Sequence, residues 1–159
     1  MSAQAFIDRF GGIYEHSPWV AELAAEVLGD DADMDEIARV MADCVDNASR
    51  ERQLELIRAH PDLAGRAQVA GELTAESTEE QSSAGLDQCT PDEFASFQRL
   101  NDAYHEKFGF PFVMAVRGSS RAEILEAFEK RLNNDYDVEF ETALVEIHRI
   151  ARLRLEAIG

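Results

Sequence analysis

The sequence predicts an all-α fold, a single-domain multi-helix bundle of about seven to nine helices with one extended buried segment at 109–117. Apolar residues recur every three or four positions along most of the chain, and helix-capping residues stand where these patterns begin and end. The 159 residues, 45% of them hydrophobic, suffice for one core, and no internal repeat divides them. We therefore expect one domain over 1–159.

Start and stop signals define the individual helices. Ser17 before Pro18 predicts an N-cap followed by the first helical residue, and Gly29 predicts the end of that helix. Thr90 and Glu93 have the spacing of a capping box. The segments with helical patterns are 2–10, 17–29, 35–49, 50–59, 90–108, 120–134 and about 138–158.

One apolar stretch, "FGFPFVMAVRG" at 108–118, lacks the helical pattern. Five apolar residues follow Pro111, and Val113 and Val116 are β-branched. No partner strand is apparent, so an extended buried segment is expected rather than a strand. Its backbone N–H and C=O groups then need hydrogen-bond partners, and a ligand is one candidate.

The composition limits the possible ligands. The formal net charge is −17, from 32 acidic and 15 basic residues. This argues against binding nucleic acid or an anionic membrane, because both need clusters of Lys and Arg. An anionic small molecule would need a locally positive pocket. The two cysteines, Cys44 and Cys89, have no metal-binding spacing, so free thiols and no metal site are expected.

No targeting signal is apparent in the sequence. No apolar run approaches the roughly 18 residues of a membrane span. The N-terminal "MSAQAFIDRF" lacks the apolar core of a secretory signal, and the C-terminal "LEAIG" is not a peroxisomal signal. We expect a cytoplasmic protein, bacterial in origin.

His60 is the first candidate catalytic residue. It precedes Pro61, which disfavours helical backbone at the residue before it, so a helix ends at or near His60. The C-terminal carbonyls of that helix favour a protonated imidazole, which suits a proton donor. The alternative is that His60 only caps the helix.

The stretch "ESTEEQSSAG" at 76–85 is the second candidate. Ser77 and Glu80 have the form of a capping box, which is the structural alternative. The same geometry exposes helix N-terminal amides that can bind a carboxylate or a ring oxygen. Gln81 adds an amide that both donates and accepts hydrogen bonds, which suits a ureido or a lactam group.

Arg154 is the third candidate. Its helical neighbours are Ile147, Ile150, Ala151 and Ile158, so it points into an apolar stripe. An arginine there needs a carboxylate from the protein or from a ligand. An internal ion pair or a side chain that reaches solvent is the alternative.

Four stretches, taken together, resemble one known family. "LIRAHPDLAG", "GELTAESTEEQSSAGL", "NDAYHEKFGFPFVMAVRG" and "RIARLRL" resemble, in this order and over nearly the whole chain, the OHCU decarboxylase family. These carboxy-lyases convert 2-oxo-4-hydroxy-4-carboxy-5-ureidoimidazoline to (S)-allantoin and CO2, the last step from urate to allantoin. The resemblance implies an all-helical homodimer that needs no cofactor.

The resemblance also implies roles for individual residues. His60 is the implied proton-transfer residue, and Glu80 is implied to take part in catalysis. The implied substrate contacts are Pro61, Ser77, Gln81, Arg154 and the main chain of Phe112, Val113, Met114, Ala115 and Val116.

Two other functions remain open from the sequence. A helical interaction module would use "FGFPFVMAV" as a partner-binding edge and the polar motifs as caps. A relative with the same fold could act on an altered substrate. The presence of all the implied side chains favours the decarboxylase.

Overall fold

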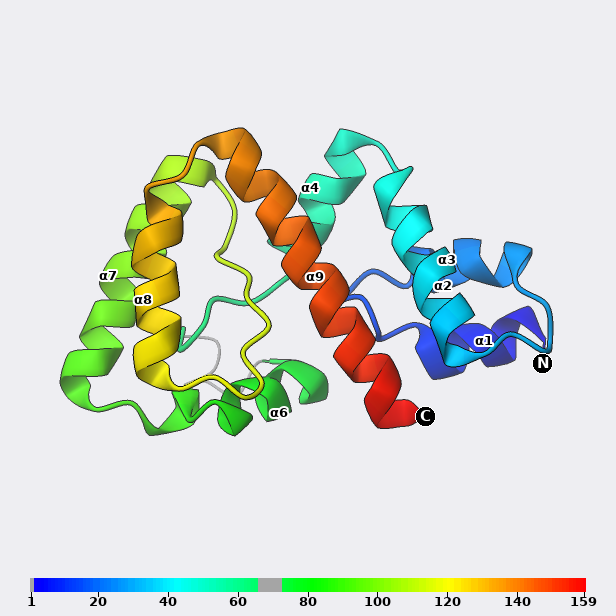
Figure 1. Cartoon of the computed structure of the whole chain (residues 1–159), viewed down its shortest axis with the longest axis horizontal. Helices are drawn as coiled ribbons and strands as arrows, with labels where there is room; N and C mark the ends of the chain where they lie inside the picture. The colour runs from blue at the N-terminus through cyan, green and yellow to red at the C-terminus, as the bar shows by residue number, and fades with distance from the viewer. Residues whose placement is uncertain (1, 66–72) are drawn as a thin grey trace. The chain divides into compact units, whose positions relative to one another are not determined.

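The computed structural model describes residues 2–65 and 73–159. These residues form eight α-helices and one 3-10 turn, with no β-strand among them (Figure 1), which confirms the predicted all-α class and helix number. The elements are α1 (Ala3–Phe10), α2 (Trp19–Val27), α3 (Met34–Asp46), α4 (Arg50–Arg58), α6 (Ala75–Ser83), η1 (Leu86–Gln88), α7 (Pro91–Phe108), α8 (Arg121–Leu132) and α9 (Tyr136–Ile158).

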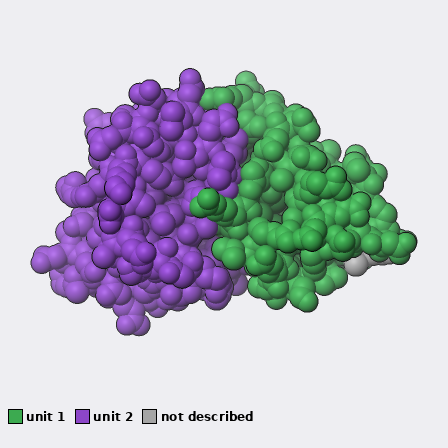
Figure 2. Space-filling view, in the orientation of Figure 1, with its two compact units in different colours: residues 1–60, 147–159 green, residues 61–146 purple. Residues whose placement is uncertain are grey.

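The described residues divide into two compact units, coloured separately in Figure 2. Unit 1 comprises the chain up to His60 together with Ile147–Gly159. Unit 2 comprises Pro61–Glu146. The first half of α9 therefore belongs to unit 2 and its second half to unit 1. None of the described helices combines the length and apolar character needed to cross a bilayer.

In unit 1, α2 packs against α1 and α3. Trp19, the only tryptophan of the sequence, is the first residue of α2, and the Arg52 guanidinium lies 4.4 Å from the centroid of its ring. The core residues of this unit with the least exposure include Phe10, Val20, Ala24, Met41, Val45, Leu56 and Ile57.

In unit 2, α7 and α8 lie side by side (Figure 1) around an aromatic cluster. The rings of Phe112 and Phe128 stack with centroids 4.0 Å apart. Tyr104 contacts both rings edge-on. This cluster packs the extended segment, through Phe112, against α7 and α8.

One helix start follows its predicted cap and two do not. Thr90 with Glu93 forms a capping box at α7, as predicted. By contrast, Ser17 does not cap α2, because its hydroxyl donates to the Glu15 carbonyl at 2.8 Å. The predicted Ser77 and Glu80 box is also wrong, because α6 begins one turn earlier. A second capping box, Ser120 with Glu123, begins α8 within the predicted 120–134 segment.

Candidate active site

His60 follows Ala59, the C-cap residue of α4, and is buried, with 8% of its surface exposed. Its Nδ1 lies 2.9 Å from the Leu56 carbonyl oxygen. A carbonyl only accepts hydrogen bonds, so Nδ1 carries the hydrogen. In the neutral imidazole, Nε2 then has a free lone pair and can act as a base.

The ionisation of His60 differs from the prediction. Burial lowers its pKa from 6.5 to about 4, and this outweighs the hydrogen bond to Leu56 and the charge of Glu15, which both raise it. Arg154 and His16 lower the pKa further. The predicted preference for the protonated form is therefore wrong, because desolvation of the charged imidazole exceeds the effect of the helix end. His60 is neutral at physiological pH.

Arg154 is buried in unit 1, as its position on an apolar stripe predicts. Its Nη1 lies 3.4 Å from Glu15 Oε1 and 3.3 Å from the carbonyl oxygens of Gly12 and Ile13. The structure therefore contains the internal ion pair that the sequence left as an alternative. Arg154 is also close enough to His60 to lower its pKa.

Glu15 is a candidate residue that sequence reasoning missed. It lies in the turns between α1 and α2, where an acidic residue is expected on the surface, yet only 2% of it is exposed. Ile13 and Tyr14, which precede it, are buried as well. This pair of apolar residues before the acid was the only local signal that the segment turns inward.

A hydrogen bond to α9 and a left-handed turn at His16 hold the segment that carries Glu15. The hydroxyl of Tyr14 lies 2.9 Å from His148 Nδ1, and His148 Nε2 lies 3.0 Å from Asp46 Oδ1. Burial raises the pKa of Tyr14, so its hydroxyl stays protonated in this contact. His16 has a φ of 47°, which turns the chain so that Glu15 and Ser17 are buried while His16 is exposed.

In unit 2, α6 presents the second group of predicted residues. Ser77 and Gln81 are buried, and Glu80 is half-buried. Gln81 Oε1 accepts a hydrogen bond from the Ala64 N–H at 3.0 Å, and its Nε2 donates to the Asp62 carbonyl at 3.2 Å. The Gln81 amide thus holds the loop that follows His60.

Two amides of α7 hold the same loop, which begins at the half-buried Pro61. Asn101 Nδ2 donates to the Leu63 carbonyl at 3.0 Å, and Gln98 Nε2 donates to the Ala64 carbonyl at 2.7 Å. Ala64 has a φ of 50°, a left-handed conformation that is strained for a residue with a side chain. These hydrogen bonds offset the strain and fix the loop within unit 2.

The extended segment obtains backbone partners from side chains, as its buried position requires. Arg131 Nη1 donates to the Val113 carbonyl at 2.6 Å, and the Ala115 N–H donates to Glu146 Oε1 at 3.2 Å. Phe112 and Val116 are buried, whereas Met114 and Ala115 are half-buried. Two of the main-chain groups of this segment are therefore already bonded inside unit 2.

A buried acid, Glu139, holds Arg131 in place, and neither residue was predicted. Glu139 has no exposed surface and lies 2.9 Å from Arg131 Nη2. It also accepts hydrogen bonds from the Tyr104 hydroxyl at 2.6 Å and from Asn134 Nδ2 at 2.8 Å. Burial and this carboxylate raise the pKa of Tyr104, so its hydroxyl remains a donor.

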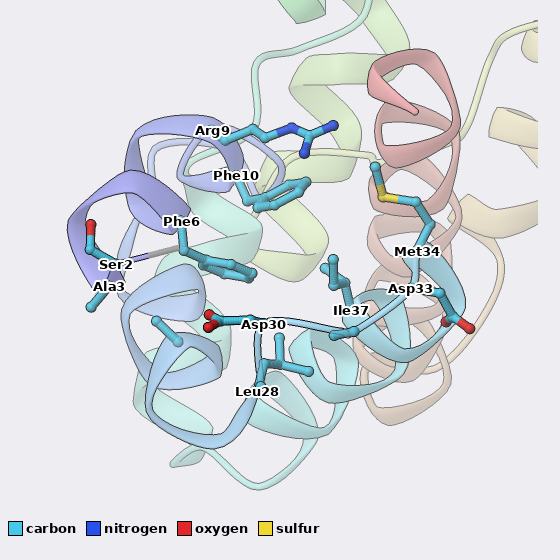
Figure 3. Close-up of a pocket in the computed structure, with 13 residues that line it drawn as sticks. Ser2, Ala3, Phe6, Arg9, Phe10, Leu28, Asp30, Asp33, Met34 and Ile37 are labelled. Carbon is cyan, nitrogen blue, oxygen red and sulfur yellow. The ribbon is translucent and has the colours of Figure 1, made fainter.

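Unit 1 also contains a cavity of about 260 Å³ (Figure 3). The rings of Phe6 and Phe10 and the side chain of Ile37 line it, with Arg9 and Asp30. None of the predicted site residues lines this cavity. Among the residues described, no three His, Cys, Asp or Glu side chains are grouped so that they could hold a metal ion.

Comparison with known proteins gives a consistent result. The model of the OHCU decarboxylase family matches residues 1–156. The 2-oxo-4-hydroxy-4-carboxy-5-ureidoimidazoline decarboxylase of Haloferax volcanii is 49% identical over 151 residues, covering 95% of this chain and 87% of the relative. The decarboxylase of the same name from Halalkalicoccus jeotgali is 46% identical over 155 residues, covering 98% and 85%.

A solved structure is similar over nearly the whole fold. A crystal structure of OHCU decarboxylase in the presence of (S)-allantoin matches with a TM-score of 0.75 and 25% identity, covering 92% of this chain and 94% of that one. The order of the four sequence motifs, the all-α fold and the matches to relatives therefore agree. The chain belongs to the OHCU decarboxylase family.

Proposed function

We propose that the protein decarboxylates 2-oxo-4-hydroxy-4-carboxy-5-ureidoimidazoline to (S)-allantoin and CO2 without a cofactor, in the last step of urate conversion to allantoin. Its family membership supports this reaction. The observation that carries the proposal is the buried, neutral His60, whose unprotonated Nε2 lies in the same unit as the cationic Arg154. The substrate carries a carboxylate, which a cation can bind, and an acidic hydroxyl, whose proton a base can accept.

The reaction needs orientation and proton transfer. The bond from the ring carbon to the carboxylate breaks, CO2 leaves, and the electron pair passes to the adjacent C=N bond, whose nitrogen takes up a proton. The resulting enol then loses its hydroxyl proton to a base while the neighbouring carbon gains a proton on one face. Proton delivery to a single face would give (S)-allantoin rather than a racemate.

His60 suits both halves of this proton transfer. Its neutral Nε2 accepts a proton at physiological pH, and a pKa of about 4 makes the resulting imidazolium a strong acid that readily returns the proton. Glu80 is the second proposed proton-transfer group. Its half-buried position on α6 leaves the carboxylate partly accessible.

The remaining predicted residues are proposed as substrate contacts. Arg154 would bind the carboxylate or the ureido oxygen, and Ser77 and Gln81 would hold the ring and the ureido group. Pro61 would lie against the substrate. The main chain of 112–116 would contribute further contacts, through groups other than the Val113 carbonyl and the Ala115 N–H already bonded by Arg131 and Glu146.

We also propose that the protein is a homodimer and acts in the cytoplasm on a small anionic substrate, without nucleic-acid or membrane partners. The resemblance to the family supports the dimer, and the excess of 32 acidic over 15 basic residues argues against nucleic-acid and anionic-membrane partners. Light scattering coupled to gel filtration tests the dimer. A single-chain mass at micromolar concentration would contradict it.

The decisive experiment generates the unstable substrate in situ from urate and follows allantoin by circular dichroism. The protein should accelerate allantoin formation and give a single-enantiomer signal. A helical interaction module, or an enzyme with another substrate, would leave the rate and the chirality at those of the spontaneous reaction. That outcome would remove the decarboxylase assignment.

A further inference from the structure

The proposed reaction makes no use of Glu15, although this residue is the buried acid of unit 1 that lies beside Arg154. A buried carboxylate is costly unless its charge is balanced and its oxygens are bonded. Two neighbouring interactions hold its backbone: the Ser17 hydroxyl donates to the Glu15 carbonyl, and Tyr14 is bonded to His148 of α9. The turn thus keeps the carboxylate inside the unit.

The contact between Glu15 and Arg154 restrains the guanidinium. Glu15 Oε1 lies 3.4 Å from Arg154 Nη1, and the carbonyls of Gly12 and Ile13 lie 3.3 Å from the same nitrogen. All three acceptors belong to the turns between α1 and α2. They fix one end of a long, flexible side chain that would otherwise lose substantial rotamer freedom on binding a ligand.

Glu15 also acts on His60 through its charge. The charged or titratable groups that act on His60 are Glu15 and His16 of the same turn and Arg154 of α9. Glu15 favours the protonated imidazole, whereas Arg154 and His16 oppose it. Without Glu15, the influence of Arg154 and His16 would add to that of burial, and all three would disfavour the protonated imidazole of His60.

We propose that Glu15 is a positioning residue for the reaction: its carboxylate orients the Arg154 guanidinium and supplies the negative charge that balances Arg154 beside His60. This inference rests on the proposed function, in which Arg154 binds the substrate and His60 carries the proton. Glu15 itself needs no contact with the substrate. It acts by holding the Arg154 guanidinium in place and by keeping His60 basic enough to accept a proton.

Two substitutions separate the two effects. Glu15→Gln keeps the shape and removes the charge, so Arg154 is held less firmly and His60 becomes harder to protonate. Glu15→Asp keeps the charge but withdraws it by one methylene, so the contact with Arg154 weakens more than the effect on His60. Glu22→Gln, an exposed acid on α2 of the same unit, is the matched control for loss of one charge.

The first measurement does not depend on activity. The sequence has four histidines, so the ring nitrogen signals of a histidine-labelled protein are few, and the His60→Gln variant identifies those of His60. The pKa of His60 should be lower in Glu15→Gln than in wild type and unchanged in Glu22→Gln. The difference should persist in 1 M KCl, because buried charges are screened much less than exposed ones.

The second measurement is kinetic. Glu15→Gln should raise KM by about tenfold or more, because Arg154 is no longer held for the anion. The acid limb of the kcat/KM profile should move to lower pH, in step with His60. Glu15→Asp should also raise KM, but the acid limb of its kcat/KM profile should move less than that of Glu15→Gln.

The outcomes are distinguishable. If Glu15→Gln lowers only the melting temperature and leaves the His60 titration and KM at wild-type values, Glu15 is merely structural and the inference is wrong. If Glu15→Gln does not fold, the same tests on Glu15→Asp decide, and a native KM would contradict the inference. If wild type itself shows no decarboxylation, the proposed function fails, while the titration still tests whether Glu15 acts on His60.

Discussion

Arg131 joins the carbonyl of Val113 to the buried carboxylate of Glu139: its Nη1 donates to the first at 2.6 Å, and its Nη2 lies 2.9 Å from the second. The guanidinium also lies over the Phe112 ring, 4.3 Å from its centroid. A segment without strand partners is therefore fixed by side chains of α8 and α9. These side-chain interactions let unit 2 bury an extended backbone segment without a β-sheet.

We expect Arg131→Met to be strongly destabilising. The change leaves the charge of Glu139 buried without its cation, which costs about 3–5 kcal/mol in other buried pairs. Urea unfolding measures the free energy. Lys130→Met, an exposed position beside it with a surface ion pair to Glu126, should cost no more than about 1 kcal/mol. Equal losses in the two variants would contradict the assigned role of Arg131.

The Gln81 amide gives a second prediction. Gln81→Leu leaves the Ala64 N–H and the Asp62 carbonyl without this partner and should cost roughly 1–3 kcal/mol of stability for each unsatisfied group. Asn101→Leu, which frees only the Leu63 carbonyl of the same loop, is the matched control. If Gln81 also binds substrate, KM should rise more in Gln81→Leu than in Asn101→Leu. Equal KM values would assign Gln81 to the loop alone.

The burial of His60 predicts a pH dependence of stability. Its pKa is 6.5 in an exposed chain and about 4 in the folded protein, so between these values the unfolded chain binds a proton that the folded chain does not. Stability from this residue is therefore fully present above pH 6.5 and is lost as pH falls toward 4, by on the order of 3 kcal/mol. The unfolding free energy of wild type minus that of His60→Gln should fall across this range. A constant difference would show that His60 is not desolvated.

Catalysis gives the fourth prediction. His60→Ala and Glu80→Ala should each lower kcat by roughly 100-fold or more if both groups transfer protons. Wild-type kcat/KM should stay level well below pH 6.5 and fall only as His60 becomes protonated, near its pKa of about 4. Stopped-flow dichroism of allantoin formation measures both. Wild-type rates in the two variants would contradict the assigned roles.

The charge of −17 predicts a strong response to salt. Repulsion among exposed carboxylates opposes the compact state, and raising KCl from about 0.1 to 1 M shortens the screening length from about 10 to 3 Å. The melting temperature should rise by on the order of 5 °C. A triple variant, Glu76→Gln with Glu106→Gln and Glu141→Gln, removes three exposed charges and should respond less. A melting temperature that falls with salt would contradict the argument.

The sequence predicts most helix ends correctly because their signals are local. Thr90 and Glu93 bond each other's backbone across a single turn, and Gly109 ends α7 in the left-handed conformation that glycine readily adopts. At Ser17 and Ser77, by contrast, local sequence signals predict a helix cap that does not form. Either serine could cap a helix, but the path of the chain into α2 and α6 assigns other residues to that place.

The candidate site is less predictable because its chemistry depends on burial. The position of His60 at a helix end and that of Arg154 on an apolar stripe follow from spacing. The neutral state of His60 does not, since desolvation is a property of the whole unit. Glu15 and Glu139 were missed for the same reason: nothing in their immediate sequence shows that each is buried beside an arginine.

Trp19 gives unit 1 an optical reporter of its own. It is the only indole of the chain, and the Arg52 guanidinium stacked on its ring makes its emission sensitive to unfolding of that unit. Far-ultraviolet dichroism, in contrast, sums over the helices of both units. Coincident denaturation curves from the two signals would identify a single cooperative domain over 1–159, and separate midpoints would show that the units unfold in sequence. One chromophore thus lets an ordinary fluorimeter measure how strongly the two halves of the chain are coupled.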